Sequence, residues 1–435
     1  MSQVPGGRPT NVARLHPHRG LALLGIASLI AVGLTGLAAG LAGPAAAAPT
    51  TKVVDGVTHV INGAQPAQGA QTLKLQEQWR AGAGEGDELF GLISQVVIDE
   101  KGNIYLLDTQ LSHAVVYSPQ GKQLRVLGRQ GEGPGEVNRP LDLLLMPDGS
   151  VGLVQTFPGK IIKVSREGAP AGIFEVGGGD PTQGGFNVAI EAKSAGNNLV
   201  LAGQRITQSA TGNSRQLFLA AFDPAGKETA RYLAKTVDMD LTKPSISEKA
   251  FSFVYPRRWG VAPDGRVWAC PERNQYAINV YAPDGKLEGV VEREYTSRPR
   301  TAEELDRVKR VLEAQVRGAP VKFETSVEST EPDIEQLRCL PDGTVWVLPS
   351  RGSVSQPTGV FATWDVFDAQ GAFVRQVAIQ CPGDPKEDGL MPTGEGHYVV
   401  VTGLVGAAMA MQGAAGEESA EEAAPMEVIY YGVAK

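Results

Sequence analysis

The chain has 435 residues and a formal net charge of −8 at pH 7, with 20% charged residues. An acidic chain of this kind is poorly suited to bind nucleic acid or anionic lipid. Its 53 glycines and 29 prolines are typical of many short strands and turns. Cys270, Cys339 and Cys381 lack metal-site spacing and allow at most one disulfide, so we expect buried or incidental thiols.

Residues 1–48 have the composition of a targeting segment. They contain Arg8, Arg14 and Arg19 but no acidic residue, then an apolar run over 21–41 and an alanine-rich end at 44–49. This order predicts a cleaved signal peptide, and the length of the apolar run leaves an uncleaved N-terminal membrane anchor as the alternative. We therefore expect an exported protein, periplasmic or extracellular, or membrane-anchored if the segment is retained.

Short turns that end in glycine recur in pairs along the rest of the chain. In many of them a proline presets the second turn residue, and the glycine suits a position with positive φ, as in hairpin turns. Pairs of hairpins at regular intervals predict a radial β-repeat. The pairs are 99–102 with 118–121, 146–149 with 165–168, 194–197 with 223–226, 262–265 with 282–285, and 340–343 with 368–371.

Each pair of turns is flanked by four apolar stretches, which predict a four-stranded meander. Five complete sets cover about 95–127, 141–176, 186–233, 259–292 and 334–379. A sixth set, from 390 to 433, lacks one strand, and the spare strand at 73–79 is its natural outer strand. The predicted fold is all-β. It is a six-bladed β-propeller of four-stranded antiparallel blades over 73–435, closed by an N-terminal strand and preceded by an extension at 49–72.

One stretch carries a family resemblance. The sequence GRQGEGPGEVNRPLD at 128–142, with Asp148-Gly149 after it and GNIYLLD at 102–108 before it, resembles the NHL-repeat pattern. The run DGVTHVIN at 55–62 looks like the N-terminal stretch of exported bacterial six-bladed propellers. The resemblance implies the fold for nearly all of the mature chain and says little about function. Broader propeller relatives include protein-binding modules, calcium-dependent lactonases and an amidating lyase.

The two ends of the predicted blades differ in loop length. The glycine turns lie at one end, and the long segments lie at the other, where variable loops on a rigid scaffold usually carry function. A capping box at Thr301 to Glu304 and an apolar stripe predict a helix near 301–317 within the largest insertion, either a lid or rim clamp or a purely structural cap. Residues 406–425 are predicted to be a disordered acidic loop. The long segments are 177–185, 203–214, 235–255, 293–333, 349–358 and 403–426.

The candidate ligand-binding residues lie where predicted inner strands begin or in nearby long segments. Tyr255 and Trp259 are placed to frame a pocket near the channel mouth, and Arg257 and Arg258 are placed to bind an anion. The alternative is that the charged residues form salt bridges between blades around the channel. The full set is Arg139, Asp142, Tyr255, Arg257, Arg258, Trp259, Glu272, Arg273, Asp333 and Glu335.

These observations favour an exported binding module that recognises a protein, peptide or glycan on the long-loop face. The alternative is a metal-dependent, calcium-using hydrolase, lactonase or lyase acting in the central channel, and a third possibility is a structural part of an envelope complex. His59, His113 and His397 do not pair at ligand spacing, so a histidine zinc site or a Ser-His-Asp triad is poorly supported. No catalytic residue or metal ligand can be named. We expect a monomer that does not bind nucleic acid and that contacts a membrane only through an uncleaved N-terminal segment.

Overall fold

The structure is a computed structural model that describes residues 48–82, 84, 89–179, 184–254, 257–319, 321–394, 396–411, 413 and 425–434. The predicted signal peptide or anchor lies outside these residues. Within the described ranges, no helix is both long enough and apolar enough to cross a membrane. The described residues belong to one compact unit, which begins at residue 45.

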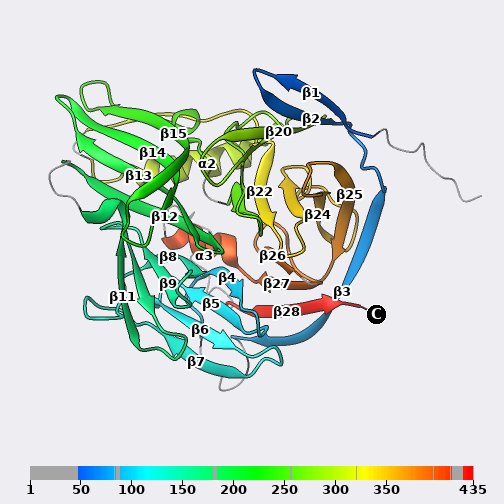
Figure 1. Cartoon of the computed structure of the whole chain (residues 1–435), viewed down its shortest axis with the longest axis horizontal. Helices are drawn as coiled ribbons and strands as arrows, with labels where there is room; N and C mark the ends of the chain where they lie inside the picture. The colour runs from blue at the N-terminus through cyan, green and yellow to red at the C-terminus, as the bar shows by residue number, and fades with distance from the viewer. Residues whose placement is uncertain are drawn as a thin grey trace, which may run out of the picture. The chain divides into compact units, whose positions relative to one another are not determined.

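The strands of the described residues form six groups of four neighbours joined by antiparallel pairing (Figure 1). In chain order the groups are β4 (Ile93–Ile98), β5 (Ile104–Asp108), β6 (His113–Tyr117), β7 (Gln123–Leu127); β8 (Pro140–Leu145), β9 (Val151–Gln155), β10 (Lys160–Val164), β11 (Pro170–Glu175); β12 (Phe186–Ala195), β13 (Asn198–Gln208), β14 (Gly212–Phe222), β15 (Glu228–Asp240); β17 (Trp259–Val261), β18 (Val267–Ala269), β19 (Ala277–Tyr281), β20 (Leu287–Arg293); β22 (Ile334–Cys339), β23 (Val345–Pro349), β24 (Val360–Phe367), β25 (Phe373–Gln380); and β26 (Gly389–Gly394), β27 (His397–Val401), β28 (Val428–Val433), β3 (Ala70–Ala81).

The remaining elements lie between or beside these groups. They are the hairpin β1 (Thr50–Val54) and β2 (Val57–Asn62), the parallel pair β16 (Ser245–Ser247) and β21 (Glu324–Ser326), the 3-10 helix η1 (Val176–Gly179), and the helices α1 (Glu248–Phe251), α2 (Ala302–Gln315) and α3 (Leu404–Met411).

The glycine turns form as the sequence predicts. Gly102 has φ of +77° and donates its N–H to the Asp99 carbonyl at 2.9 Å. The Asp99 carboxylate also accepts the backbone N–H groups of Lys101 and Asn103, at 2.9 and 2.8 Å. This local hydrogen bonding explains why Asp at the first position and Gly at the last specify the turn.

The core lies between neighbouring four-stranded groups. Leu107 and Val116 of the first group pack with Leu143 and Leu153 of the second, and all four are fully or almost fully buried. Similar apolar clusters join the later groups. The first strands of successive groups (β4, β8, β12, β17, β22 and β26) therefore face a common interior.

Strand β3 joins the N-terminal part of the chain to the last two groups. Its first half pairs in parallel with β25, and its second half pairs antiparallel with β28 (Figure 1). Trp79 on β3 stacks between Tyr117 and Tyr430, at centroid distances of 5.3 and 5.2 Å. Its indole N–H donates to the Pro119 carbonyl at 3.1 Å, so the closing strand also contacts the first group. The pairing with β28 agrees with the role predicted for residues 73–79.

Helix α2 has the predicted capping box and confirms the helix predicted near 301–317. Two other features differ from the sequence predictions. The 49–72 extension contains the β1–β2 hairpin, and β2 adds in parallel to β20. Residues 404–411 form α3 rather than the start of a disordered loop, because Leu404 and the neighbouring alanines pack against the cluster around Ile93. Most of the remaining predicted loop, 414–424, lies outside the described residues.

We expect Gly121→Ala to destabilise the protein more than Gly149→Ala. Both glycines end glycine turns and have positive φ, +81° and +83°, so both alanines carry a backbone cost of about 1 kcal/mol. A Cβ at Gly121 would lie 2.5 Å from the Trp79 ring, whereas a Cβ at Gly149 meets nothing within 4 Å. The clash should add about 1–3 kcal/mol, measurable as a lower urea unfolding midpoint. Equal midpoints for the two variants would show that Trp79 is not held against the turn.

Candidate functional site

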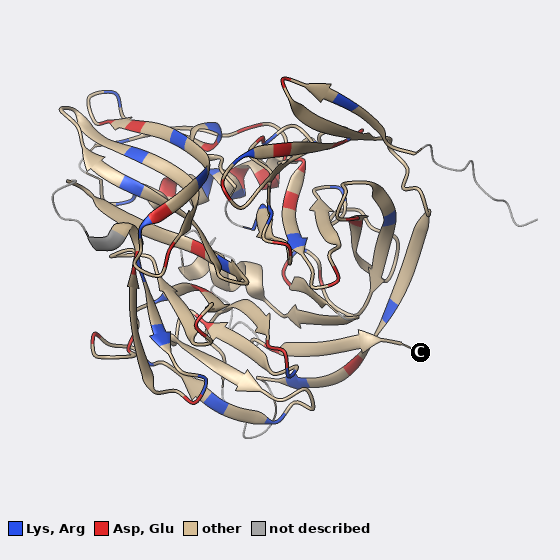
Figure 2. Cartoon of the chain, viewed as in Figure 1, with Lys and Arg blue, Asp and Glu red and all other residues tan. Residues whose placement is uncertain are grey.

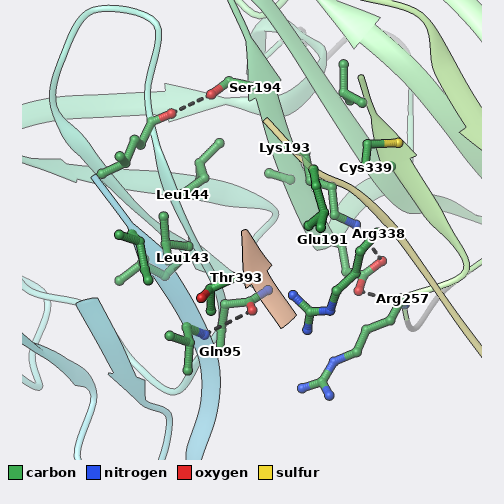
Figure 3. Close-up of a pocket in the computed structure, with 18 of the residues that line it drawn as sticks. Gln95, Leu143, Leu144, Glu191, Lys193, Ser194, Arg257, Arg338, Cys339 and Thr393 are labelled. Carbon is green, nitrogen blue, oxygen red and sulfur yellow. Dashed lines mark hydrogen bonds and ion pairs between the residues drawn. The ribbon is translucent and has the colours of Figure 1, made fainter. Parts of the chain in front are cut away.

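Two cavities are lined by four of the ten predicted site residues, Arg257 and Trp259 in one and Arg258 and Glu335 in the other. The first strands of all six groups line one cavity of about 360 Å³, which we call the central cavity (Figure 3). The second, of about 970 Å³, is bounded by α2 and by the segments 353–361 and 381–386, and we call it the long-loop cleft. Both volumes are within the range of small-molecule and peptide sites.

Glu191 on β12 organises the central cavity. Its two carboxylate oxygens accept the Arg257 backbone N–H at 2.8 Å and the Trp259 indole N–H at 2.6 Å. Trp259 is fully buried, and the Lys193 ammonium lies 3.8 Å from its ring centroid. The structure therefore brings the predicted residues Arg257 and Trp259 together with Glu191 and Lys193. Arg257, Glu191 and Lys193 are labelled in Figure 3.

Asp142 on β8 is buried beside this group. One of its oxygens accepts the Gln95 amide at 2.7 Å, and the other accepts the Ala192 backbone N–H at 2.9 Å. Burial raises the pKa of Asp142 to about 6, and the nearby Glu191 carboxylate contributes to the increase. Asp142 thus serves mainly to hold the first strands of neighbouring groups in register.

Gln95, Glu191, Lys193 and Arg338 were not among the predicted site residues. Gln95, Asp142 and Gln336 each precede the glycine of the following turn by the same number of residues. This regular spacing in the sequence could have identified them as equivalent positions. In the structure each directly follows a β-bulge in its first strand, as Glu191 also does. A bulge re-aims the side chains after it, which explains why polar groups recur at this level of the cavity.

The central cavity does not match a calcium site. Calcium needs six to eight oxygen ligands, yet all four carboxylate oxygens of Asp142 and Glu191 accept N–H donors. Three cationic side chains also line or adjoin the same space. Among the described residues, no group of three or more His, Cys, Asp or Glu side chains is arranged to hold a metal ion.

Glu335 lies in the long-loop cleft, at the bulge of β22. The Ser353 hydroxyl donates to its carboxylate at 3.0 Å. Burial raises the pKa of Glu335 to about 7, although the Ser353 hydrogen bond opposes the increase. This carboxyl group therefore changes charge near neutral pH.

Arg258 also lines the cleft and is 6% exposed. One of its terminal nitrogens donates to the Ser252 hydroxyl at 3.2 Å and to the Phe253 carbonyl. Its other terminal nitrogen, Nη1, is buried and has no partner among the described residues. Burial lowers the pKa of this guanidinium. An unsatisfied buried donor at a cleft wall is available to a ligand.

Arg273 belongs to a charged network beside the cleft. Glu248 accepts from Arg273 and Arg300, at 2.9 and 2.7 Å, and Arg300 also pairs with Glu331 at 2.9 Å. Burial would raise the pKa of Glu248, but hydrogen bonds from Arg300 and the Glu328 backbone outweigh it and lower the pKa. The network fixes the segment before α2. It corresponds to the alternative stated from the sequence, in which the charged residues form salt bridges.

The other predicted residues lie elsewhere. Asp333 is buried and donates its backbone N–H to the Arg273 carbonyl at 2.8 Å. Arg139 and Glu272 are exposed, and neither lines the central cavity or the cleft. Tyr255 lies outside the described residues. The three cysteines are free thiols, and burial raises the pKa of each to about 12.

Comparisons with known proteins give similarity to solved structures only. No protein-family model matches the chain, and no curated protein matches it. A DUF4221 family member from Bacteroides vulgatus is 8% identical over 83% of this chain and 97% of that one, with a TM-score of 0.46. A Bacteroides fragilis protein described as exported is 9% identical over 84% and 99%, with a TM-score of 0.44. The calcium-binding protein regucalcin from Agrobacterium tumefaciens is 12% identical over 84% and 97%, with a TM-score of 0.40.

We expect Glu335→Gln to alter how stability depends on pH. The folded-state pKa, about 7, lies above the usual 4.5, so the contribution of Glu335 is fully present below about pH 4.5 and is lost as the pH rises through 7. Wild type and Glu335→Gln should melt at similar temperatures at pH 5, and the variant should melt about 2 °C higher or more at pH 8. Glu288→Gln, an exposed change on β20, is the control. A constant difference between wild type and Glu335→Gln at both pH values would contradict the prediction.

We also expect chelation to leave the protein unaffected. Because the carboxylates of the central cavity are already satisfied by N–H donors, EDTA should not change the melting temperature, and added calcium should not raise it. The measurement is differential scanning fluorimetry on the purified protein, with metal analysis beside it. Stoichiometric metal, or a calcium-dependent rise in the melting temperature, would restore the metal-dependent alternative.

Proposed function

We propose that residues 73–435 form a six-bladed β-propeller of an exported protein, and that this propeller binds a polypeptide segment in the long-loop cleft. The proposal rests on one observation above the others. Three of the long segments, 293–333 with α2, 349–358 and 403–426, contribute to a single cleft of about 970 Å³. Loops on one end of a rigid β scaffold are the usual carriers of recognition in such folds.

The lining of the cleft supports a peptide-like ligand. Val360, Phe361 and Val405 supply apolar surface, while Ser353 and Gln356 supply hydrogen-bonding groups beside it. The buried, unpartnered nitrogen of Arg258 suits a carbonyl or carboxylate oxygen. Apolar walls with a few placed polar groups are typical of sites that bind a defined segment.

The charges around the cleft also favour a polypeptide over a polyanion. Arg307 and Lys386 line it together with Glu303 and Asp384, so both signs are present. Basic and acidic residues are likewise intermingled over the sheets (Figure 2). A segment with side chains of both signs can complement such a surface, whereas a nucleic acid or acidic polymer would be repelled by part of it.

Helix α2 forms part of the rim. Thr301, Glu303, Glu304 and Arg307 line the cleft, and Arg298 pairs with Glu304 at 3.0 Å to fix the start of the helix. This position supports the rim-clamp interpretation over a purely structural cap. Because α2 is anchored by ion pairs at its N-terminus, the rim of the cleft is already ordered before a ligand binds. Binding therefore costs less conformational entropy.

The test is selection from a random peptide library on the purified protein, followed by affinity measurement with the selected peptide. Glu335→Gln and Ser353→Ala should each weaken binding by about ten-fold, equivalent to about 1.4 kcal/mol. The control Glu288→Gln, which lies on β20 outside the cleft, should leave affinity unchanged. A glycan array is screened in parallel.

Two results would overturn the proposal. One is failure of the wild-type protein to select any peptide, including the case in which it binds only glycans on the array. The other is selection of peptides whose affinity is the same in the two cleft variants as in wild type, since that would place recognition on another surface.

A further inference from the structure

We propose that the central cavity binds a small organic anion carrying a carboxylate or phosphate group, held by the guanidinium groups of Arg257 and Arg338. This site is separate from the long-loop cleft. The proposal depends neither on the peptide ligand nor on its location.

The central cavity contains more cationic than anionic side chains. Lys193, Arg257 and Arg338 line it, and the carboxylates beside them are Asp142 and Glu191. Cations therefore exceed anions locally, although the chain as a whole has a net charge of −8. Such a local reversal of sign in an enclosed space concentrates anions there.

The two carboxylates beside the cavity accept hydrogen bonds from groups other than the arginine side chains. Glu191 accepts from the Arg257 backbone and the Trp259 indole, and Asp142 accepts from Gln95 and a backbone N–H. Neither carboxylate accepts a hydrogen bond from a guanidinium side chain within the described ranges. The two acidic groups hold the strands together and leave the arginine side chains without a bonded counter-ion.

Arg338 on β22 is the clearest unpaired group. Within the described ranges its side chain makes no hydrogen bond or ion pair, and its Nε is buried. Burial and, to a smaller extent, the positive charge of Arg257 lower the pKa of Arg338 to about 10. The group stays charged at neutral pH, and an isolated buried charge is costly unless something pairs with it.

Arg257 lies beside Arg338. Its Nη2 donates to the Ser94 carbonyl at 2.5 Å, and no partner is recorded in the described part of the chain for its remaining side-chain N–H groups. Figure 3 shows the two arginine side chains extending in the same direction, toward the Gln95 side of the cavity. The N–H donors of two planar guanidinium groups match the oxygens of carboxylate and phosphate groups.

The size and walls of the cavity define the ligand class. Its volume of about 360 Å³ suits a small molecule. Apolar side chains such as Val96, Leu144 and Leu337 complete the wall, so an apolar body can follow the charged group. The lining continues to Ile98 and Leu340, at the ends of β4 and β22 next to the short glycine turns, and entry is expected from that end.

The experiment measures melting temperature and calorimetric binding with inorganic phosphate and with succinate, at constant ionic strength set with sodium chloride. Wild type should melt at a higher temperature with at least one of the two anions, and the better probe identifies the preferred group. Arg338→Met should melt about 2 °C higher or more without added anion, because an unpaired charge is removed, and should lose the anion-dependent rise. Arg338→Lys keeps the charge but not the fork, and should bind at least about ten-fold more weakly.

Arg125→Met, on the exposed outer strand β7, is the matched control and should respond to anions as wild type does. The proposal is overturned if neither anion stabilises wild type beyond the chloride control, or if the response persists unchanged in Arg338→Met. Should the Met variant fail to fold, Arg338→Lys decides, and unchanged affinity in that variant also overturns the proposal.

Discussion

The pairing of β3 with both β25 and β28 is the constraint on which the rest of the described structure depends. Without it, the three strands β26 to β28 would form an incomplete group next to the first one. With it, Trp79 stacks against Tyr117 and Tyr430 and joins the last group to the first. Pairing that uses strands distant in sequence removes an exposed edge and converts a series of meanders into a closed arrangement. Closure also brings β26 beside β4, so that Thr393 and Gln95 line the same central cavity.

Glu191 shows how the interior of this arrangement is stabilised by short hydrogen bonds, with a longer ion pair to Lys193 at 3.9 Å beside them. Its oxygens accept a backbone N–H and an indole N–H from the segment that enters β17. Hydrogen bonds to a charged acceptor contribute more than neutral ones and satisfy a buried carboxylate. The Arg257 backbone, at φ of +65°, is held in the left-handed region partly by this bond. The consequence is that, among the described residues, Glu191 pairs with Lys193 while the guanidinium groups of Arg257 and Arg338 have no ion pair.

The parts of the structure that the sequence predicted are those set by local chemistry. Gly102 and Asp99 specify a turn by themselves, and Thr301 with Glu304 specifies the start of α2. Helix α3 was missed because eight residues are too few to form a stable helix by themselves, and this helix is stabilised by packing against residues far along the chain. The parallel addition of β2 to β20 was missed for the same reason.

The site was predicted only in part, because side chains meet through strand register rather than sequence proximity. Arg257 and Trp259 stood out as a cluster of charged and aromatic residues at the start of a strand. Arg338 and Glu191 lie within ordinary strands, and only their bulges and neighbours show that they face the same cavity. A one-residue change of register would reverse the face on which each lies.

Strand β22 connects the two cavities. It carries Glu335 at its bulge in the long-loop cleft and Arg338 near its other end in the central cavity. At about 3.3 Å per residue, the two Cα atoms lie roughly 10 Å apart along the strand. The charges that shift the pKa of Arg338 are those of Arg257, Glu191 and Asp142, and those that shift the pKa of Glu335 are Glu331, Arg298 and Glu304. One strand therefore places a carboxyl group and a guanidinium in two separate electrostatic environments. A strand can do this because its register fixes which residues reach each cavity.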